Sequence, residues 1–176
     1  MLWTTGNRQA QGLKIVRLPK GQPLLSRLGK IESAEHFMSS AAETSVKISS
    51  HDTGGAYAVM EASTPPSSGP PLHLHQREDE WWYILEGNFL FEIDDNSVHA
   101  GPGDTVFAPR GSRHTFQNIG TALARTLVTV VPGGLDLFFQ EVDATVPSDT
   151  LPDPAVILPI FRKYRLELLG PPLSKR

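Results

Sequence analysis

The sequence of 176 residues contains no cysteine, no long apolar run and no large excess of charge. Because cysteine is absent, no disulfide framework can form, and any metal ligand must be a nitrogen or an oxygen atom. No stretch approaches the ~18 consecutive apolar residues that a membrane-spanning helix needs, and the first residues lack the apolar core of a secretory signal. The net charge of −3 argues against a nucleic-acid partner. These absences predict a cytoplasmic protein that binds neither nucleic acid nor membrane.

Glycine and proline, by contrast, are abundant, with 15 of each. Both residues favour turns. Short strand-like stretches lie between the glycine- and proline-containing turns from about residue 44 to residue 132. Many short strands separated by turns are typical of an all-β sandwich or barrel. The length favours a single domain, so we expect a barrel over 44–132, an arm over 1–43 and an extension over 133–176.

Two histidines and a glutamate stand in the first of two informative segments. His73 and His75 are separated by one residue, so in a strand their side chains point to the same face, about 6.5–7 Å apart. Glu80 begins the next strand-like run, which Gly87 ends at a turn. Two imidazoles and a carboxylate can therefore approach one point from neighbouring strands.

A third histidine, His114, stands in the second segment, after a short apolar strand and the bend that Pro109 and Gly111 impose. It belongs to a different strand, and closing the sheet would bring it to the first two histidines. Three neutral nitrogens and one anionic oxygen suit a divalent transition metal and leave positions open for water, oxygen or substrate. The expected ligands of one iron, manganese, nickel, cobalt or zinc ion per chain are His73, His75, Glu80 and His114.

The two segments together resemble the two motifs of the cupin family. The residues at the family's spacing are His73, His75, Glu80 and Gly87 in the first motif, and Gly103, Pro109, Gly111, His114 and Asn118 in the second. The opening glycine of the first motif is replaced by Ser67, at a turn position that is not a ligand. The resemblance implies a jelly-roll barrel, or double-stranded β-helix, and assigns the metal to the four ligands.

Each ligand has an ordinary explanation when it is taken alone. A pair of histidines one residue apart is often a surface pair, and Glu80 could be a solvated charge beside Glu78 and Asp79. His114 could be a histidine whose hydrogen bonds are satisfied within a turn. The presence of all four residues at matching spacings favours the metal site.

The residues after the predicted barrel show helical periodicity. The apolar residues at this spacing are Leu135, Phe138, Phe139 and Val142. They predict a helix that packs on the barrel as a lid. A second helix is expected over about 155–166, with Asp153 as its N-cap and Pro154 in its first position. Pro159 predicts that this helix is kinked or starts late.

The Pro-Gly-Gly segment at 132–134 and the helix after it are similar to the segment beyond the barrel in quercetin-dioxygenase-like cupins. This similarity implies a pocket that accepts a small aromatic or enol-type substrate. Trp82 and Phe116 stand two positions after Glu80 and His114, so strand alternation turns them inward as well. The candidate lining residues are Met60, Trp82, Phe91, Phe107 and Phe116. Any of them could instead be ordinary barrel core.

The resemblance supports three hypotheses for the function. The first is a metal-dependent dioxygenase, in which Glu80 is a ligand or the catalytic base. The second is non-redox isomerisation, decarboxylation or hydrolysis at the same site. The third is a barrel that binds a small ligand without catalysis. The complete ligand set favours an enzyme, and we place the dioxygenase first, although the fold alone does not decide among these functions.

A homodimer is also expected. A small sheet leaves edges that natural proteins usually pair or cover. The strand-like stretch Leu13–Leu18 in the arm could pair with a partner barrel, as happens in cupins that resemble this chain.

Overall fold

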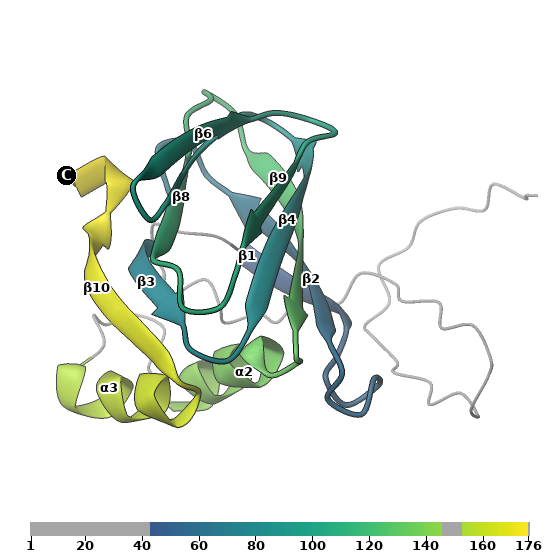
Figure 1. The fold of residues 1–176 in the computed structure, drawn as a ribbon, viewed down its shortest axis with the longest axis vertical. Helices are drawn as coiled ribbons and strands as arrows, with labels where there is room; N and C mark the ends of the chain where they lie inside the picture. The colour runs from purple at the N-terminus through teal and green to yellow at the C-terminus, as the bar shows by residue number, and fades with distance from the viewer. Residues whose placement is uncertain (1–42, 146–152, 176) are drawn as a thin grey trace, which may run out of the picture.

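A computed structural model describes residues 43–145 and 153–175 and shows a barrel of two β-sheets with two helices at one end (Figure 1). The pairing of its strands is antiparallel throughout the described residues. The predicted all-β barrel is therefore confirmed. The expected arm strand Leu13–Leu18 and the linker at 146–152 lie outside the described residues.

The described strands form two sheets of five strands each. The first sheet contains, in spatial order, β1 (Glu43–Ile48), β2 (Ala58–Thr64), β9 (Ala124–Val131), β4 (Asp79–Glu86) and β7 (Thr105–Ala108). The second sheet contains β10 (Leu166–Pro172), β3 (Pro71–His75), β8 (His114–Asn118), β5 (Phe89–Ile93) and β6 (Asn96–Ala100). Many neighbours, such as β2 and β9, are far apart in the sequence, so long-range pairing builds the barrel.

The core lies between the two sheets because burial alternates along the strands. In β2 and β9 every second side chain is buried, as the two-residue period of a strand requires. Trp82 and Phe91 are almost fully buried, and their ring centroids lie 5.2 Å apart. This aromatic core joins the sheets and thereby sets the separation of side chains that face each other across the barrel.

Both turn positions of the first motif have a left-handed backbone. Gly87 has a φ of 86°, and a Cβ atom added there would come within 2.4 Å of the Cβ of Ala124. Ser67, at the position where the family motif has glycine, has a φ of 58°. For a residue with a Cβ atom this conformation costs roughly 1 kcal/mol. Ser67 therefore keeps the turn geometry of the motif at an energetic cost that glycine would avoid.

Helices α2 (Leu135–Thr145) and α3 (Pro154–Lys163) pack on each other beneath the strands in Figure 1. The rings of Phe138 and Phe161 meet edge to face, with their centroids 4.9 Å apart. The hydroxyl of Tyr164 donates a hydrogen bond of 2.7 Å to Glu141 of α2. Burial and this carboxylate raise the pKa of Tyr164 to about 12. The hydroxyl therefore remains a donor at neutral pH.

The start of α3 agrees with the expected cap, since Asp153 accepts a hydrogen bond of 2.8 Å from the backbone N–H of Ala155. Pro159 lies inside the helix, which begins at Pro154 and so has no late start. The expected end of the helix at about residue 166 is wrong. Arg165 turns the chain with a φ of 57°, and the next residues form β10.

Strand β10 is an addition to the barrel that periodicity did not predict. It pairs with β3, and Leu166 and Leu168 lie opposite His75 and His73. Residues of the C-terminal extension therefore complete the sheet that carries three of the four candidate ligands, His73, His75 and His114.

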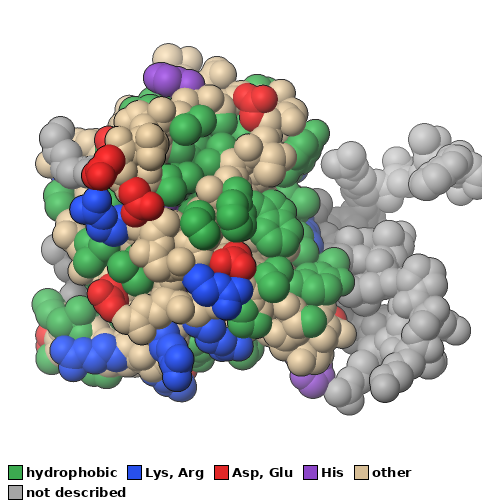
Figure 2. Space-filling view, in the orientation of Figure 1, with side chains coloured by type: hydrophobic (Ala, Val, Ile, Leu, Met, Phe, Trp, Pro, Cys, Tyr) green, Lys and Arg blue, Asp and Glu red, His purple; other side chains and the backbone are tan. Residues whose placement is uncertain are grey.

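Charged and apolar side chains share the outer surface, as Figure 2 shows for one face. Arg125 on β9 contacts Glu61 on β2 at 2.6 Å and Glu86 on β4 at 2.7 Å. Lys47 on β1 lies 2.9 Å from the other oxygen of Glu61. These ion pairs link four adjacent strands. Within the described ranges no helix has the length and hydropathy needed to cross a membrane.

Candidate metal centre

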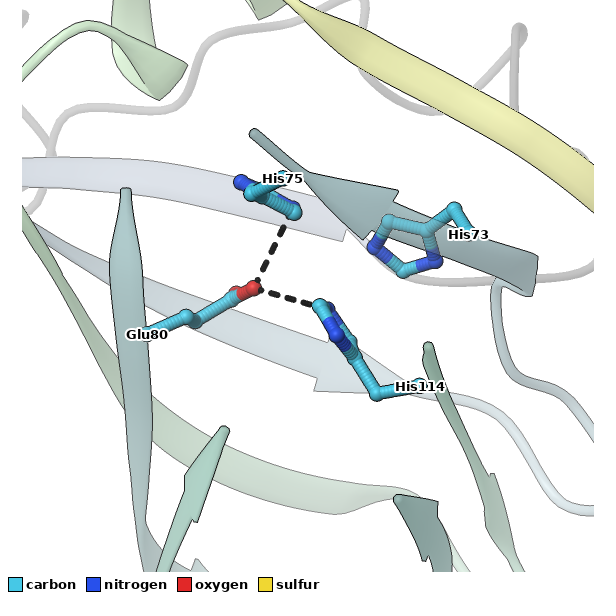
Figure 3. A group of neighbouring side chains, drawn as sticks. All are labelled: His73, His75, Glu80 and His114. Atoms are coloured by element: carbon cyan, nitrogen blue, oxygen red, sulfur yellow. Dashed lines mark ion pairs between the residues drawn. The ribbon is translucent and has the colours of Figure 1, made fainter. Parts of the chain in front are cut away.

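Four side chains from three strands point toward one another between the sheets (Figure 3). Each of them offers one ligand atom, and these atoms all lie within 4.8 Å of one another. The four residues are the expected ligands His73, His75, Glu80 and His114. The group lies on the inner side of the barrel, since three of the four are buried.

Strand register explains why these residues meet. His73 and His75 share a face of β3, because side chains alternate along a strand. His114 is the first residue of β8 and lies directly opposite His73 in the ladder. Glu80 reaches the group from β4 of the other sheet. Its Oε2 atom lies 3.3 Å from the Nε2 atoms of both His75 and His114.

Backbone carbonyls orient two of the imidazole rings. The Nδ1 atom of His73 lies 2.8 Å from the carbonyl oxygen of Pro71, and that of His114 lies 3.0 Å from the oxygen of Ser112. A carbonyl oxygen can only accept a hydrogen bond, so each Nδ1 atom must carry the proton. The Nε2 atoms of both rings are then free to act as metal ligands.

The chemistry of the cluster fits a divalent cation. Glu80 and His114 are buried, and the Oε2 atom of the first and the Nε2 atom of the second have no hydrogen-bond partner. Such buried polar atoms are costly unless something satisfies them. A metal ion with three nitrogen ligands and one oxygen ligand would satisfy both.

The ionisation states also suit a metal. Burial, with the neighbouring His114 and His75, holds the pKa of His73 well below its usual range. Burial alone would raise the pKa of Glu80, but the interactions with His75 and His114 outweigh it and lower that pKa. At neutral pH His73 therefore offers a neutral nitrogen and Glu80 an anionic oxygen, which are the forms that bind metal.

A fifth residue, Glu78, lies beside the cluster and was not among the expected site residues. Its side chain is only 3% exposed, and its Oε2 atom lies 3.7 Å from the Nδ1 atom of His75. Neither atom has a hydrogen-bond partner. In the sequence Glu78 resembles a solvated charge, because it stands in an acidic run with Asp79 and Glu80. Periodicity gave no signal here, since Glu78 precedes strand β4.

The turn of the second motif is tied to the strand that carries Glu80. Arg110 makes a two-pronged contact with Asp79, through Nε at 3.0 Å and Nη2 at 2.7 Å. These hydrogen bonds, with one from the Arg110 backbone, lower the pKa of Asp79 to about 2. Gly111 donates its backbone N–H to the carbonyl of His75 at 2.7 Å. Together these contacts hold the two motifs in register.

An apolar cavity of about 800 Å³, part of which is open to solvent, lies against the cluster. Its lining includes three of the expected residues, Met60, Trp82 and Phe116. Apart from His73, His75 and Glu80, the only polar side chain among the described lining residues is that of Thr44.

Two expected lining residues lie elsewhere. Phe91 is fully buried in the barrel core, where its ring contacts Phe116 at 5.3 Å between centroids. Phe107 is 53% exposed. Strand alternation explains this position, because Val106 and Ala108 are the residues that β7 turns inward. The expectation that Phe107 faces the cavity is therefore wrong.

The part of the chain that matches a known protein family contains the whole candidate site. The Cupin domain family matches residues 60–130, which contain all four candidate ligands. The curated oxalate-binding protein of Thermotoga maritima is 30% identical over 103 residues, covering 58% of this chain and 77% of that protein. Quercetin 2,3-dioxygenase of Bacillus subtilis is 25% identical over 89 residues, covering 51% of this chain and 26% of that protein.

Two further matches show how much of a relative the chain covers and which fold it shares. An uncharacterized protein of Methanocaldococcus jannaschii is 33% identical over 79 residues, which cover 45% of this chain and 63% of that protein. The chain therefore spans less than two thirds of that protein and of the quercetin dioxygenase. The solved structure of KdgF from Halomonas sp. matches with a TM-score of 0.50 at 16% identity, covering 55% of this chain and 84% of that one. At this identity the match shows a shared fold.

Proposed function

This chain belongs to the cupin domain family, and on that basis we propose that it is a metal-dependent dioxygenase acting on a small aromatic or enol-type substrate. One observation carries the proposal. Three of the four candidate ligands, His73, His75 and Glu80, line a cavity whose other described walls are almost entirely apolar. Such a cavity suits a substrate that presents an oxygen donor to the cluster and an apolar body to the walls.

The donors that would hold the metal are His73, His75, Glu80 and His114. A divalent transition metal bound there would supply Lewis acidity and open coordination positions; iron, manganese, nickel, cobalt and zinc remain alternatives. Glu80 is the residue we assign as catalytic base, since a carboxylate in this position can take the hydroxyl proton of the substrate. Trp82 and Phe116 line the cavity and would pack against the substrate ring. The apolar walls would keep water away from the resulting enolate.

The relatives support two different ligands. A relative named quercetin dioxygenase favours an aromatic substrate, whereas a relative named oxalate-binding protein favours a small dicarboxylate and binding without catalysis. The second candidate function is therefore a non-catalytic cupin that binds a small acid. The lining supports the first, because its described part contains no lysine or arginine to pair with a second carboxylate.

Oxygen uptake and product formation test this proposal. Protein of known metal content would be incubated with flavonols, catechols and β-diketones. We expect product with consumption of dioxygen. Glu80→Gln at matched metal content should lose turnover by about 100- to 10,000-fold, the usual effect of removing a positioned base. Product without oxygen consumption would support isomerisation, decarboxylation or hydrolysis instead. Binding without turnover would support the second candidate.

We also propose a homodimer in which the arm segment Leu13–Leu18 pairs with a partner barrel. Among the strands that the structure describes, the sheets end at β1 and β7 and at β10 and β6, and such edges are usually paired or covered. Light scattering should give a dimer mass for the full chain and a monomer mass after deletion of residues 1–42. A cytoplasmic location stays a prediction.

A further inference from the structure

One wall of the cavity is built by residues that lie outside the matched region 60–130. We call it the C-terminal wall, and it consists of Leu135, Phe138, Phe139, Phe161, Leu166 and Leu168. These residues come from α2, α3 and β10. All of them are apolar, so the C-terminal wall offers a ligand neither a charge nor a hydrogen-bonding side chain.

Packing and polar anchors hold the C-terminal wall in place. The ring centroid of Phe138 lies 4.9 Å from that of Phe161 and 5.4 Å from that of Phe139. At the start of α2 the buried carboxylate of Asp136 accepts a hydrogen bond of 2.7 Å from the backbone N–H of Ser50 and another from its hydroxyl. A wall anchored in this way is formed before a ligand arrives, so binding requires little further ordering.

Charge is available on one side of the cavity only. The ionisable residues of its described lining are His73, His75 and Glu80, and all three belong to the metal cluster. A charged group held against the buried residues of the C-terminal wall, such as Phe138, Phe161 and Leu166, would lie without a partner, at a cost of several kcal/mol. An apolar group there would gain about 25 cal/mol for each Å² removed from water.

We infer that the C-terminal wall selects the ligand, and that this ligand is an apolar molecule with its oxygen donors at one end and no charge at the other. The inference rests on the proposed function only in that the donor end meets the metal. It does not require catalysis, so binding can test it independently of turnover.

Two naphthols that differ at one position provide the test. Zinc-loaded protein, which keeps the metal but lacks its redox chemistry, would be titrated calorimetrically with 2-naphthol and with 6-hydroxynaphthalene-2-sulfonate. We expect the sulfonate to bind at least about 30-fold more weakly, because its charge would be buried at the C-terminal wall. Phe139→Ala should weaken 2-naphthol binding by about 10-fold through lost apolar contact. Phe139→Lys should reduce or reverse the difference in affinity between 2-naphthol and the sulfonate, because the lysine would pair with the sulfonate charge.

Leu137→Ala is the matched control, since Leu137 lies on the same helix but is 42% exposed and away from the cavity. This variant should bind both naphthols as the wild type does. Equal affinity of the wild type for the two naphthols would overturn the inference. So would unchanged 2-naphthol affinity in a Phe139→Ala variant that melts at the wild-type temperature. Absence of oxygen uptake would refute the dioxygenase proposal and leave this preference intact.

A different observation, the buried carboxylate of Glu78, carries a second inference. Among the three candidate histidine ligands, His73 and His114 direct Nδ1 to backbone carbonyls. His75 has no such partner, and the carboxylate of Glu78 lies 3.7 Å from its Nδ1 atom. We infer that Glu78 is a positioning residue that accepts the Nδ1–H of His75 when metal is bound, and so directs Nε2 toward the ion.

Glu78 is enclosed so that it cannot easily turn away. A Cβ atom on Gly134 would lie 3.3 Å from its Oε1 atom, which shows how closely the start of α2 approaches. The Nη1 atom of Arg77 lies 3.8 Å from the same oxygen and balances part of the buried charge. Arg77 also donates to the carbonyl of Gly133 at 3.1 Å. The carboxylate is therefore held between Arg77, its neighbour in the connection from β3 to β4, and the start of α2.

Zinc affinity and the NMR signal of the His75 Nδ1 proton test whether Glu78 positions His75. Zinc affinity would be measured by competition with a chelator for wild type, Glu78→Gln and Glu78→Leu. We expect a loss of about 10- to 100-fold for Glu78→Leu, the usual effect of removing a partner that orients a ligand, and a smaller loss for Glu78→Gln. The NMR signal of the His75 Nδ1 proton should shift in Glu78→Gln, while those of His73 and His114 stay in place.

Glu86→Gln is the control, because it removes the same charge from an exposed side chain on the outer surface. It should leave zinc affinity unchanged. An unmoved His75 proton in Glu78→Gln would overturn the role, as would wild-type zinc affinity in Glu78→Leu. If Glu78→Leu does not fold, the Glu78→Gln spectrum still decides the question.

Discussion

The metal-side wall of the cavity and the C-terminal wall are fixed by different kinds of interaction. On the metal side, His73 and His114 are oriented by carbonyls two residues away in the chain, and they face each other in paired strands. In the C-terminal wall, Phe138 is held by the rings of Phe161 and Tyr164, which lie on and next to another helix. On the metal side the orientation of each ring is local in the sequence, although the pairing of β3 with β8 is long-range. In the C-terminal wall the position of Phe138 depends on two helices meeting.

This difference separates two properties of the site. Metal binding depends on strand register and on backbone carbonyls, whereas the choice of ligand depends on aromatic packing. Substitutions in one wall should therefore change one property and spare the other.

Loss of a metal ligand should have the largest effect. We expect His114→Ala to lower metal affinity by more than about 1,000-fold, well beyond the 10- to 100-fold cost of losing a group that only orients a ligand. The barrel should remain folded because its aromatic core does not depend on the ion. Elemental analysis would measure metal content, and circular dichroism would check the fold. Full metal content in the variant would contradict the assignment of the site.

Truncation of a side chain in the C-terminal wall should lower stability and leave metal affinity almost unchanged, the reverse of what we expect for His114→Ala. Phe138 is 3% exposed, and Phe138→Ala should lower the free energy of unfolding by about 3 kcal/mol, the low end for a buried phenylalanine. Metal affinity should stay within about threefold of wild type, which is less than 1 kcal/mol. Denaturation and chelator competition on the same preparation would measure both quantities. A parallel loss of metal would show that the walls are coupled.

The pair of Asp79 and Arg110 should give a smaller effect that depends on pH. Hydrogen bonds from Arg110 lower the pKa of Asp79 from 3.8 to about 2 in the folded protein. A carboxyl group whose folded pKa is depressed adds stability above its unfolded pKa, and that stability is lost as the pH falls toward the folded value. Asp79→Asn should therefore cost up to about 1 kcal/mol at neutral pH, since the pair is partly exposed.

The stability difference between wild type and Asp79→Asn should shrink as the pH falls from about 4 to about 2. Urea denaturation across this range would measure it. A difference that stays constant with pH would mean that the charge of Asp79 contributes nothing to the tie between the two motifs.

The smallest expected effect concerns the one motif position that lacks its glycine. Ser67→Gly should raise the free energy of unfolding by about 0.5 kcal/mol, because glycine adopts the φ of 58° without strain but loses more entropy on folding. Ser68→Gly is the control, since Ser68 does not have a positive φ. A gain in both variants would indicate a cause other than backbone strain.

Much of the barrel and of the site could be predicted because the signals are short in range. The alternation of side chains puts His73 and His75 on one face, and turn residues such as Gly87 and Gly111 mark where strands end. The strands were predicted on this basis, whereas the ligand cluster was predicted from its spacing together with the resemblance to the two cupin motifs. The cap of α3 at Asp153 is also local and was predicted correctly.

Other features could not be predicted from nearby residues. Phe107 carries the same apolar signal as Trp82, but only the pairing of β7 with β4 decides which of them faces the cavity. The segment at 166–172 is a strand because β3 offers it a partner far away in the sequence. Glu78 is buried at a place where the start of α2, distant in the sequence, approaches its carboxylate.

The sequence by itself determined the ligand types, their spacing and the turns that bring them together, since each depends on the backbone geometry of a few consecutive residues. Only the tertiary structure decided what surrounds the cluster. The C-terminal wall and the burial of Glu78 arise when α2, α3 and β10 dock on the barrel. Docking of this kind depends on apolar area and on partners distant in the chain, which no local pattern records.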